Sequence, residues 1–214
     1  PIEDVDGNGS PDWQDELLSS GVAVATSSEQ SAEDPLEHMS VSVAAALYGG
    51  YLSLKQDGSY SATKGNELAQ NVASNIRAPL LATPLTVDDI LVRKNEPGAA
   101  LEYRTETREA LTPMVTEDPP ELEYFAEYIS TKDIAWLAQL AKAAEKYRDA
   151  RTNMLAVAAP TEALPEQLRA LNALGAYAET LERLARFGNN TFASVALLKT
   201  LNESEEEMLA AFDA

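Results

Sequence analysis

Residues 132–187 decide the fold; they read KDIAWLAQLAKAAEKYRDARTNMLAVAAPTEALPEQLRALNALGAYAETLERLARF. Apolar side chains recur there at spacings of three and four, which is the period of a helix with one buried face. Pro160 and Thr161 interrupt this period, so we expect two antiparallel helices, at about 132–158 and 162–187. The residues expected to face one another are Ile134, Leu137, Ala141, Ala144 and Met154 from the first helix and Leu164, Leu168, Leu171, Gly175, Ala178 and Leu181 from the second.

Helical patterns continue on both sides of this pair. Upstream, apolar residues at helical spacing predict helices over about 36–54 and 63–76. Further helices are expected at about 97–113, 119–130 and 191–212. No repeat of 20 to 50 residues is present, which argues against a solenoid. The sequence therefore predicts an all-α fold, an irregular bundle of about seven helices.

A few residues mark where these helices begin, end or approach each other. Thr63 is expected to cap the second helix, and Gly188 to end the one that runs through Phe187. Gly49 and Gly50 lie inside the first helix, where each costs about 1 kcal/mol relative to alanine. We therefore expect them either to form a kink or to let another helix approach closely.

Residues 79–95 are the least helical stretch of the chain. Pro79 and Pro84 disfavour helix, and the run from Thr86 to Val92 is typical of extended chain or of one short strand. A strand without a partner is not stable alone, so we expect a clasp over the helices, or pairing between two copies of the chain. The fold is thus expected to contain at most one short strand.

The charge of the chain excludes some classes of partner. The sequence has 35 acidic and 16 basic residues, a net charge of −19 and a pI near 4.3. Such a surface repels phosphate backbones and anionic lipids, so we expect no nucleic-acid binding. No apolar run approaches the ~18 residues needed to span a bilayer. The absence of cysteine excludes disulfides and thiolate chemistry.

The sharpest chemical motif is the stretch DVDGNGSPDWQD, residues 4–15. Oxygen-bearing side chains alternate there as in an EF-hand calcium loop, and Gly9 stands at the sixth position, where the turn is tight. Asp15 stands where the consensus has Glu, so we expect weak affinity, roughly 10⁻⁴ to 10⁻³ M. The residues predicted to bind Ca²⁺ are Asp4, Asp6, Asn8, Ser10 through its carbonyl, Asp12 and Asp15.

This loop resembles the calcium repeats of thrombospondin type 3 and the loops of dockerin modules. The resemblance covers about a dozen of the 214 residues, and the helical remainder loosely resembles uncharacterised helical domains of exported bacterial proteins. It implies calcium binding and a location outside the cytoplasm, at the cell surface. The sequence begins at Pro1, almost inside the loop, so we expect a signal or membrane anchor upstream.

The expected organisation follows from these segments. Residues 1–19 form the calcium loop and its exiting helix, 20–34 a flexible linker of small and polar residues, and 35–214 the helical bundle domain. The expected function is a non-catalytic interaction or scaffold module, whose partner is a protein or a cell-envelope polymer. A variant is a homo-oligomeric subunit of a calcium-dependent surface filament or layer.

Catalysis is the other class of function considered. His38 is the only histidine, which excludes metal centres that need two imidazoles, and no nucleophile-elbow or phosphate-binding glycine motif is present. An enzyme would need a site of carboxylates and tyrosines between helices, with acids of raised pKa. The aromatic residues from Tyr124 to Tyr147 form either part of the core or the floor of a binding site.

Overall fold

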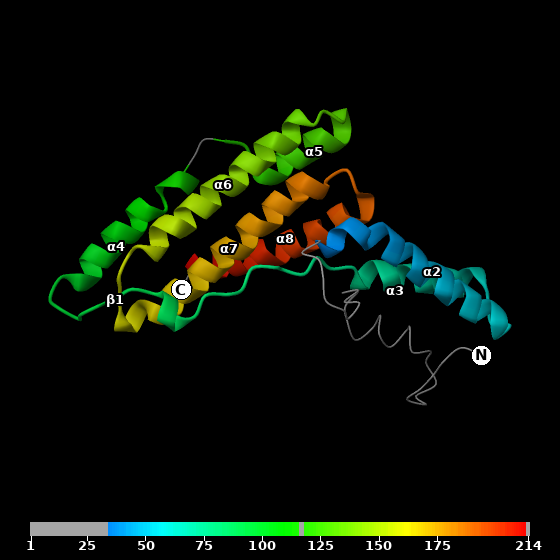
Figure 1. The fold of residues 1–214 in the computed structure, drawn as a ribbon, viewed down its shortest axis with the longest axis horizontal. Helices are drawn as coiled ribbons and strands as arrows, with labels where there is room; N and C mark the ends of the chain where they lie inside the picture. The colour runs from blue at the N-terminus through cyan, green and yellow to red at the C-terminus, as the bar shows by residue number, and fades with distance from the viewer. Residues whose placement is uncertain (1–33, 116–117, 213–214) are drawn as a thin grey trace. The chain divides into compact units, whose positions relative to one another are not determined.

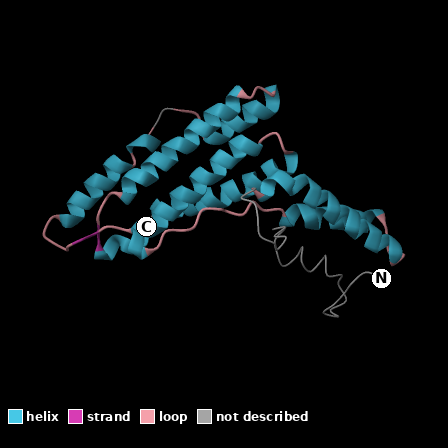
Figure 2. Ribbon diagram, viewed as in Figure 1, coloured by secondary structure: helices cyan, strands magenta, loops and turns pink. Residues whose placement is uncertain are grey.

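The computed structural model describes residues 34–115 and 118–212 of the chain (Figure 1). This part contains seven α-helices, which confirms the all-α prediction (Figure 2). The helices are α2 (Met39–Gln56), α3 (Ala62–Asn75), α4 (Ala99–Ala110), α5 (Glu121–Thr131), α6 (Ala135–Leu155), α7 (Leu164–Phe187) and α8 (Thr191–Phe212). Among the described residues, no helix is both long and apolar enough to cross a bilayer.

The described residues group into two compact units. The first combines residues up to Pro79 with Asn189–Lys199, and the second combines Leu80–Gly188 with the residues from Thr200 onward. The expected calcium loop and nearly all of the expected linker lie outside the described residues. That 35–214 forms a single domain stays a prediction.

In the first unit, α2 packs against α3, and the buried residues of α2 include Met39, Val43 and Ala46. α2 continues through both of its central glycines. A Cβ atom on Gly50 would lie 2.6 Å from Cδ1 of Leu68 on α3, so this glycine permits the close approach that the sequence allowed for. Ser61, not Thr63, caps α3: its hydroxyl accepts a hydrogen bond from the Lys64 N–H at 3.2 Å.

In the second unit, α6 and α7 lie side by side and form the main helix pair, with α5 and α4 also packed on α6 (Figure 1). Ala144, Met154, Leu171, Ala178 and Leu181 are buried as predicted. Ile134 was predicted to be buried and is 75% exposed, because α6 begins only at Ala135 and the apolar period does not extend to the residue before it.

Gly188 ends α7 for a different reason from the one expected. Its φ of −59° lies in the ordinary helical region, so the left-handed conformation that favours glycine is not used. A Cβ atom there would lie 2.9 Å from the Leu184 carbonyl oxygen and 3.1 Å from Cε2 of Phe125 on α5. The end of α7 itself and the side chains packed on it from α5 and α6 therefore leave little room for a Cβ atom at this position.

The described residues contain a two-stranded sheet where a single strand was expected. β1 (Val92–Arg93) pairs in parallel with β2 (Ala159–Pro160), and the Ala159 N–H donates to the Leu91 carbonyl at 2.8 Å. β2 has only two residues, which is too short for an apolar period to reveal it. The Arg93 Nε donates to the Ala158 carbonyl at 2.5 Å and further fixes this contact.

Candidate functional site

The six predicted calcium ligands, Asp4, Asp6, Asn8, Ser10, Asp12 and Asp15, all lie outside the described residues. Calcium binding by them stays a prediction. Within residues 34–115 and 118–212, no group of three or more His, Asp or Glu side chains is placed to hold a metal ion. The candidate site in the described part is therefore built from other chemistry.

An extended segment, residues 80–85, runs along α7, and we call it the strap. The Glu179 carboxylate accepts the Leu81 N–H at 2.7 Å and the Ala82 N–H at 3.1 Å. Two turns earlier on the same face of α7, the Asn172 side chain accepts the Leu85 N–H at 2.7 Å and donates to the Leu85 carbonyl at 3.1 Å. All four bonds involve main-chain groups of the strap, so α7 recognises its backbone.

Both ends of this contact are supported by further polar groups. Glu179 also lies 3.5 Å from the guanidinium of Arg183, and both side chains are mostly buried. After the strap, the Thr86 N–H and hydroxyl donate to the Asp89 carboxylate at 2.8 and 2.9 Å and form a tight turn. These bonds, the backbone one first, lower the pKa of Asp89 below its ordinary value of 3.8.

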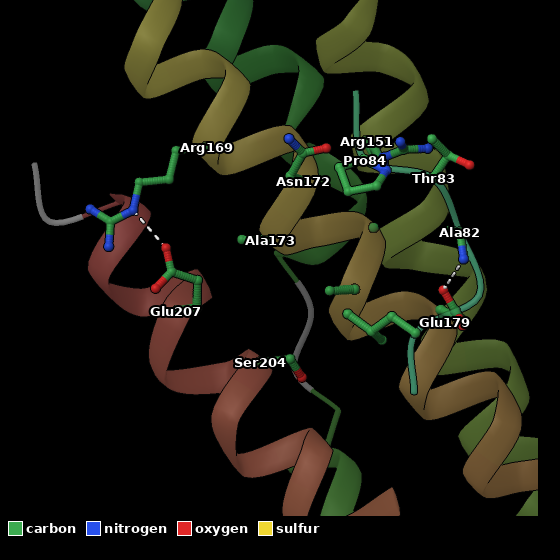
Figure 3. Close-up of a pocket in the computed structure, with 13 residues that line it drawn as sticks. Ala82, Thr83, Pro84, Arg151, Arg169, Asn172, Ala173, Glu179, Ser204 and Glu207 are labelled. Carbon is green, nitrogen blue, oxygen red and sulfur yellow. Dashed lines mark hydrogen bonds and ion pairs between the residues drawn. The ribbon is translucent and has the colours of Figure 1, made fainter. Parts of the chain in front are cut away.

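A pocket of about 340 Å³ opens between the strap, α7 and α8 (Figure 3). In the figure, Ser204 and Glu207 of α8 lie on one side of α7 and the strap lies on the other. Much of the surface between them comes from small or apolar side chains. The lining contains Leu80, Ala82, Thr83, Pro84, Arg151, Arg169, Asn172, Ala173, Gly175, Ala176, Glu179, Ser204 and Glu207.

Arg151 reaches this pocket from α6. Its Nε donates to the Leu171 carbonyl at 3.0 Å. A Cβ atom on Gly175 would lie only 2.8 Å from that Nε, so the glycine leaves the space in which the half-buried guanidinium lies. Figure 3 draws Arg151 with Thr83 and Pro84, away from the Arg169–Glu207 pair.

Arg169 is placed differently, since two of its three guanidinium nitrogens are engaged and its charge is paired with Glu207. Its Nε bonds Glu207 at 2.7 Å and its Nη1 bonds the Ala210 carbonyl at 3.2 Å. The bond to Glu207 raises the pKa of Arg169, and the same bond lowers the pKa of Glu207. This pair connects α7 to α8 at the edge of the pocket.

A second cluster joins α5, α6 and α7. The Glu121 carboxylate accepts the Tyr147 hydroxyl at 2.6 Å and the Tyr177 hydroxyl at 3.5 Å, and the two rings meet edge to face at 4.7 Å. Burial, followed by the interaction with Glu121, raises the pKa of both tyrosines above 10.0. A pocket of about 210 Å³ that also includes Lys142 and Gln139 lies beside Glu121.

The aromatic residues between Tyr124 and Tyr147 thus divide into two kinds. Phe125 and Tyr128 belong to the core, with 5% and 7% of their surface exposed. Tyr124 stacks on Trp136 at 6.3 Å between ring centres, and Tyr124 and Tyr147 line the smaller pocket. The core alternative holds for Phe125 and Tyr128, and a binding role for Tyr124 and Tyr147 stays a prediction.

Sequence reasoning missed the residues that hold the strap and line its pocket. Asn172, Glu179 and Arg151 are ordinary polar residues of amphipathic helices. Nothing in their spacing reveals that Asn172 and Glu179 bind a segment 87 to 98 residues upstream, or that Arg151 lines a pocket beside it. The available signal was the pair of prolines at 79 and 84, which predicted an extended clasp over the helices. The structure places such a clasp at 80–85, slightly before the run from Thr86 to Val92 that was expected to form it.

No protein-family model matches the chain, and no curated protein or solved structure is significantly similar to it. The resemblance of residues 4–15 to thrombospondin type 3 and dockerin loops stays a prediction from those residues. A function is accordingly proposed from the chain's own residues and geometry.

Proposed function

We propose that this chain is a non-catalytic interaction or scaffold module that works outside the cytoplasm, at a cell surface. Its partner is a protein or a cell-envelope polymer, and a calcium ion orders its N-terminal loop. The observation that most supports an interaction role is the set of hydrogen bonds between side chains of α7 and the main chain of the strap. Asn172 and Glu179 bind peptide groups of an extended segment, which is chemistry that suits the recognition of polypeptide chains.

The calcium part of the proposal is supported by the residues of the loop alone. Asp4, Asp6, Asp12 and Asp15 place four carboxylates within twelve residues, and these repel one another without a cation. A bound Ca²⁺ removes this repulsion and fixes the turn that leads toward Trp13 and Leu17. We expect removal of calcium to affect the N-terminus and to leave the helices folded.

Among the described residues, the Glu121 cluster is the one that combines a carboxylate with tyrosine hydroxyls between helices, as the enzyme alternative would need. A raised pKa keeps the hydroxyls of Tyr147 and Tyr177 protonated at neutral pH. A tyrosine that acts as a base or nucleophile needs the opposite shift. The cluster therefore supports a structural role, in which two hydroxyls donate to one carboxylate and join three helices.

One observation favours self-assembly into a surface filament or layer as a second candidate. Val41, Tyr48 and Leu52 lie on one face of α2 at spacings of seven and four, and their exposed fractions are 69%, 64% and 37%. An exposed apolar helix face of this kind is typical of a contact with another molecule. Calcium-dependent assembly would use the loop and this face together.

Calcium titration by calorimetry tests the proposal. Wild type is compared with Asp4→Ala/Asp6→Ala and with the charge-matched control Asp57→Ala/Asp88→Ala, whose aspartates are exposed. We expect saturable binding that the first double variant loses and the control keeps. Absence of binding up to about 10 mM calcium would contradict the calcium loop. Light scattering on the same samples separates a monomer from a calcium-dependent assembly.

A further inference from the structure

We propose that the pocket between the strap, α7 and α8 binds a small organic monoanion, a carboxylate on a short aliphatic chain, and that Arg151 binds the carboxylate. The volume of about 340 Å³ lies at the lower end of the ~300–1,000 Å³ typical of small-molecule sites. None of the described residues that line the pocket is a predicted calcium ligand, and the proposed ligand needs no calcium. This inference therefore goes beyond the proposed function and stands independently of it.

The apolar part of the ligand is indicated by the walls of the pocket. Leu80 and Pro84 contribute from the strap, and Ala173 and Ala176 from α7. These side chains are short or aliphatic and offer no hydrogen bonds. A chain of a few methylene groups would bury apolar surface against them, which contributes about 0.8 kcal/mol for each CH₂ that is fully buried.

The anionic part is indicated by Arg151. A guanidinium has five N–H donors in a planar fork, and the structure uses Nε alone for the bond to Leu171. Neither Nη1 nor Nη2 of Arg151 has a hydrogen bond or ion pair with any residue that the structure describes. A carboxylate with two oxygens matches these two terminal nitrogens in a bidentate pair.

Among the described residues of this unit, the other arginines that are not exposed are Arg93 and Arg183, and both have carboxylate partners. Arg93, which is similarly half-buried, bonds Glu106 and lies near Glu102, and the buried Arg183 lies 3.5 Å from Glu179. The chain has an excess of 19 negative charges, so carboxylate partners are plentiful. Arg151 lines the pocket, and its Nη1 and Nη2 bond none of the carboxylates in the part of the chain that the structure describes.

The charges around the pocket favour a monoanion over a phosphate. Its lining contains two arginines and two glutamates, and Arg169 is already neutralised by Glu207. The remaining acid, Glu179, is engaged with the strap and with Arg183. A dianion would meet two carboxylates, and among the described lining residues only Arg151 is an arginine without an ion pair. A single carboxylate balances the charge of Arg151.

Ligand-observed NMR and calorimetry with hexanoate test this site, in the presence of EDTA so that the calcium loop plays no part. We expect saturable binding to the full chain. Arg151→Met, which keeps an unbranched side chain of similar length, should weaken binding by about 10-fold to 100-fold through loss of a charged bidentate pair. The matched control Arg148→Met removes an exposed arginine that pairs with Glu182 on α7 and does not line the pocket. It should bind hexanoate within twofold of wild type.

Two further measurements test the proposal even if Arg151→Met does not fold. On wild type, the neutral analogue hexanamide should bind at least tenfold more weakly than hexanoate. Ala176→Leu should block binding, because the larger side chain fills the pocket while Arg151 stays in place. Equal binding of the acid and the amide, or no binding of hexanoate or of the peptides named below up to about 20 mM, would overturn the proposal.

The carboxylate has two natural sources, and one comparison separates them. A short peptide that ends in leucine is tested with a free and with an amidated C-terminus. Tighter binding of the free peptide than of hexanoate would assign the site to a polypeptide C-terminus. Tighter binding of hexanoate would assign it to a small aliphatic acid. Binding of inorganic phosphate as strong as that of either carboxylate would contradict the choice of a monoanion.

Discussion

Asn172 on α7 binds both main-chain groups of Leu85, although 87 residues separate them in the sequence. One side-chain amide thus replaces the hydrogen bonds that a neighbouring strand would supply to this residue. The strap is an extended segment that is stabilised by helix side chains in place of a sheet. This contact makes the stability of the strap depend on a few polar residues of α7.

Asn172→Ala should release the C-terminal end of the strap. The substitution removes two hydrogen bonds and should lower the free energy of unfolding by about 1–3 kcal/mol. Urea denaturation measures this change, and hydrogen exchange at the Leu85 amide should become faster. Gln139→Ala, an exposed amide on α6, serves as the control and should leave both measurements nearly unchanged. Unaltered exchange at Leu85 in the Asn172 variant would contradict the role of this side chain.

Gly188→Ala should destabilise the second unit. The new Cβ would lie 2.9 Å from the Leu184 carbonyl oxygen and 3.0 Å from Cδ2 of Leu137, so the backbone must shift, at a cost of about 1–3 kcal/mol. Gly65→Ala is the matched control. Its Cβ would meet Tyr60 at an ordinary 3.6 Å inside α3, and alanine should stabilise that helix by about 0.5–1 kcal/mol. Thermal unfolding should therefore move in opposite directions for the two variants.

Asp89 should contribute to stability in a way that acid removes. The pKa of its carboxyl group in the folded chain is below the ordinary 3.8. The ionised carboxylate therefore stabilises the fold above pH 3.8, and this stabilisation is lost as the pH falls through the pKa of the folded chain. The difference in urea midpoint between wild type and Asp89→Asn should accordingly narrow as the pH is lowered below 3.8. Asp88→Asn, the neighbouring exposed control, should show a smaller difference at every pH. A gap that stays constant with pH would rule out this role for Asp89.

Tyr147 should give the opposite dependence at high pH. The pKa of its hydroxyl in the folded chain is raised above 10.0, so the protonated hydroxyl stabilises the fold below pH 10. This contribution decreases at higher pH, because the same hydroxyl ionises more readily in the unfolded chain. Tyr147→Phe should cost about 1.5–3 kcal/mol at neutral pH, because Glu121 loses a charged hydrogen bond. The variant should also lose less stability than wild type between about pH 10 and 12. Chemical denaturation across this range measures both effects.

The helices were predictable because their apolar period is long and regular. α6, α7 and α8 extend over 21, 24 and 22 residues, so an error of a few residues at an end leaves the assignment intact. The errors occur at helix ends, where a single residue determines the first position of the helix. Ser61 caps α3 in place of Thr63, and Ile134 lies one residue before α6 begins.

The site was much less predictable than the helices. The spacing of Asn172 and Glu179 indicates that they share a helix face, but it does not say which distant segment they bind. The space for the Arg151 guanidinium arises because Gly175 lacks a Cβ, and a glycine inside a helix has several explanations at the sequence level. The short parallel pairing of β1 with β2 likewise depends on tertiary packing, which two residues cannot encode.

The hold of α7 on the strap has a consequence for the evolution of this chain. Glu179 and Asn172 bind main-chain groups, and every residue except proline has both the N–H and the carbonyl. The side chains of Leu81, Ala82 and Thr83 are exposed. We therefore expect the side chains of the strap to drift in related proteins while the two α7 residues stay constant. Since Thr83 also lines the pocket beside Arg151, such drift would change the preferred ligand without loosening the scaffold.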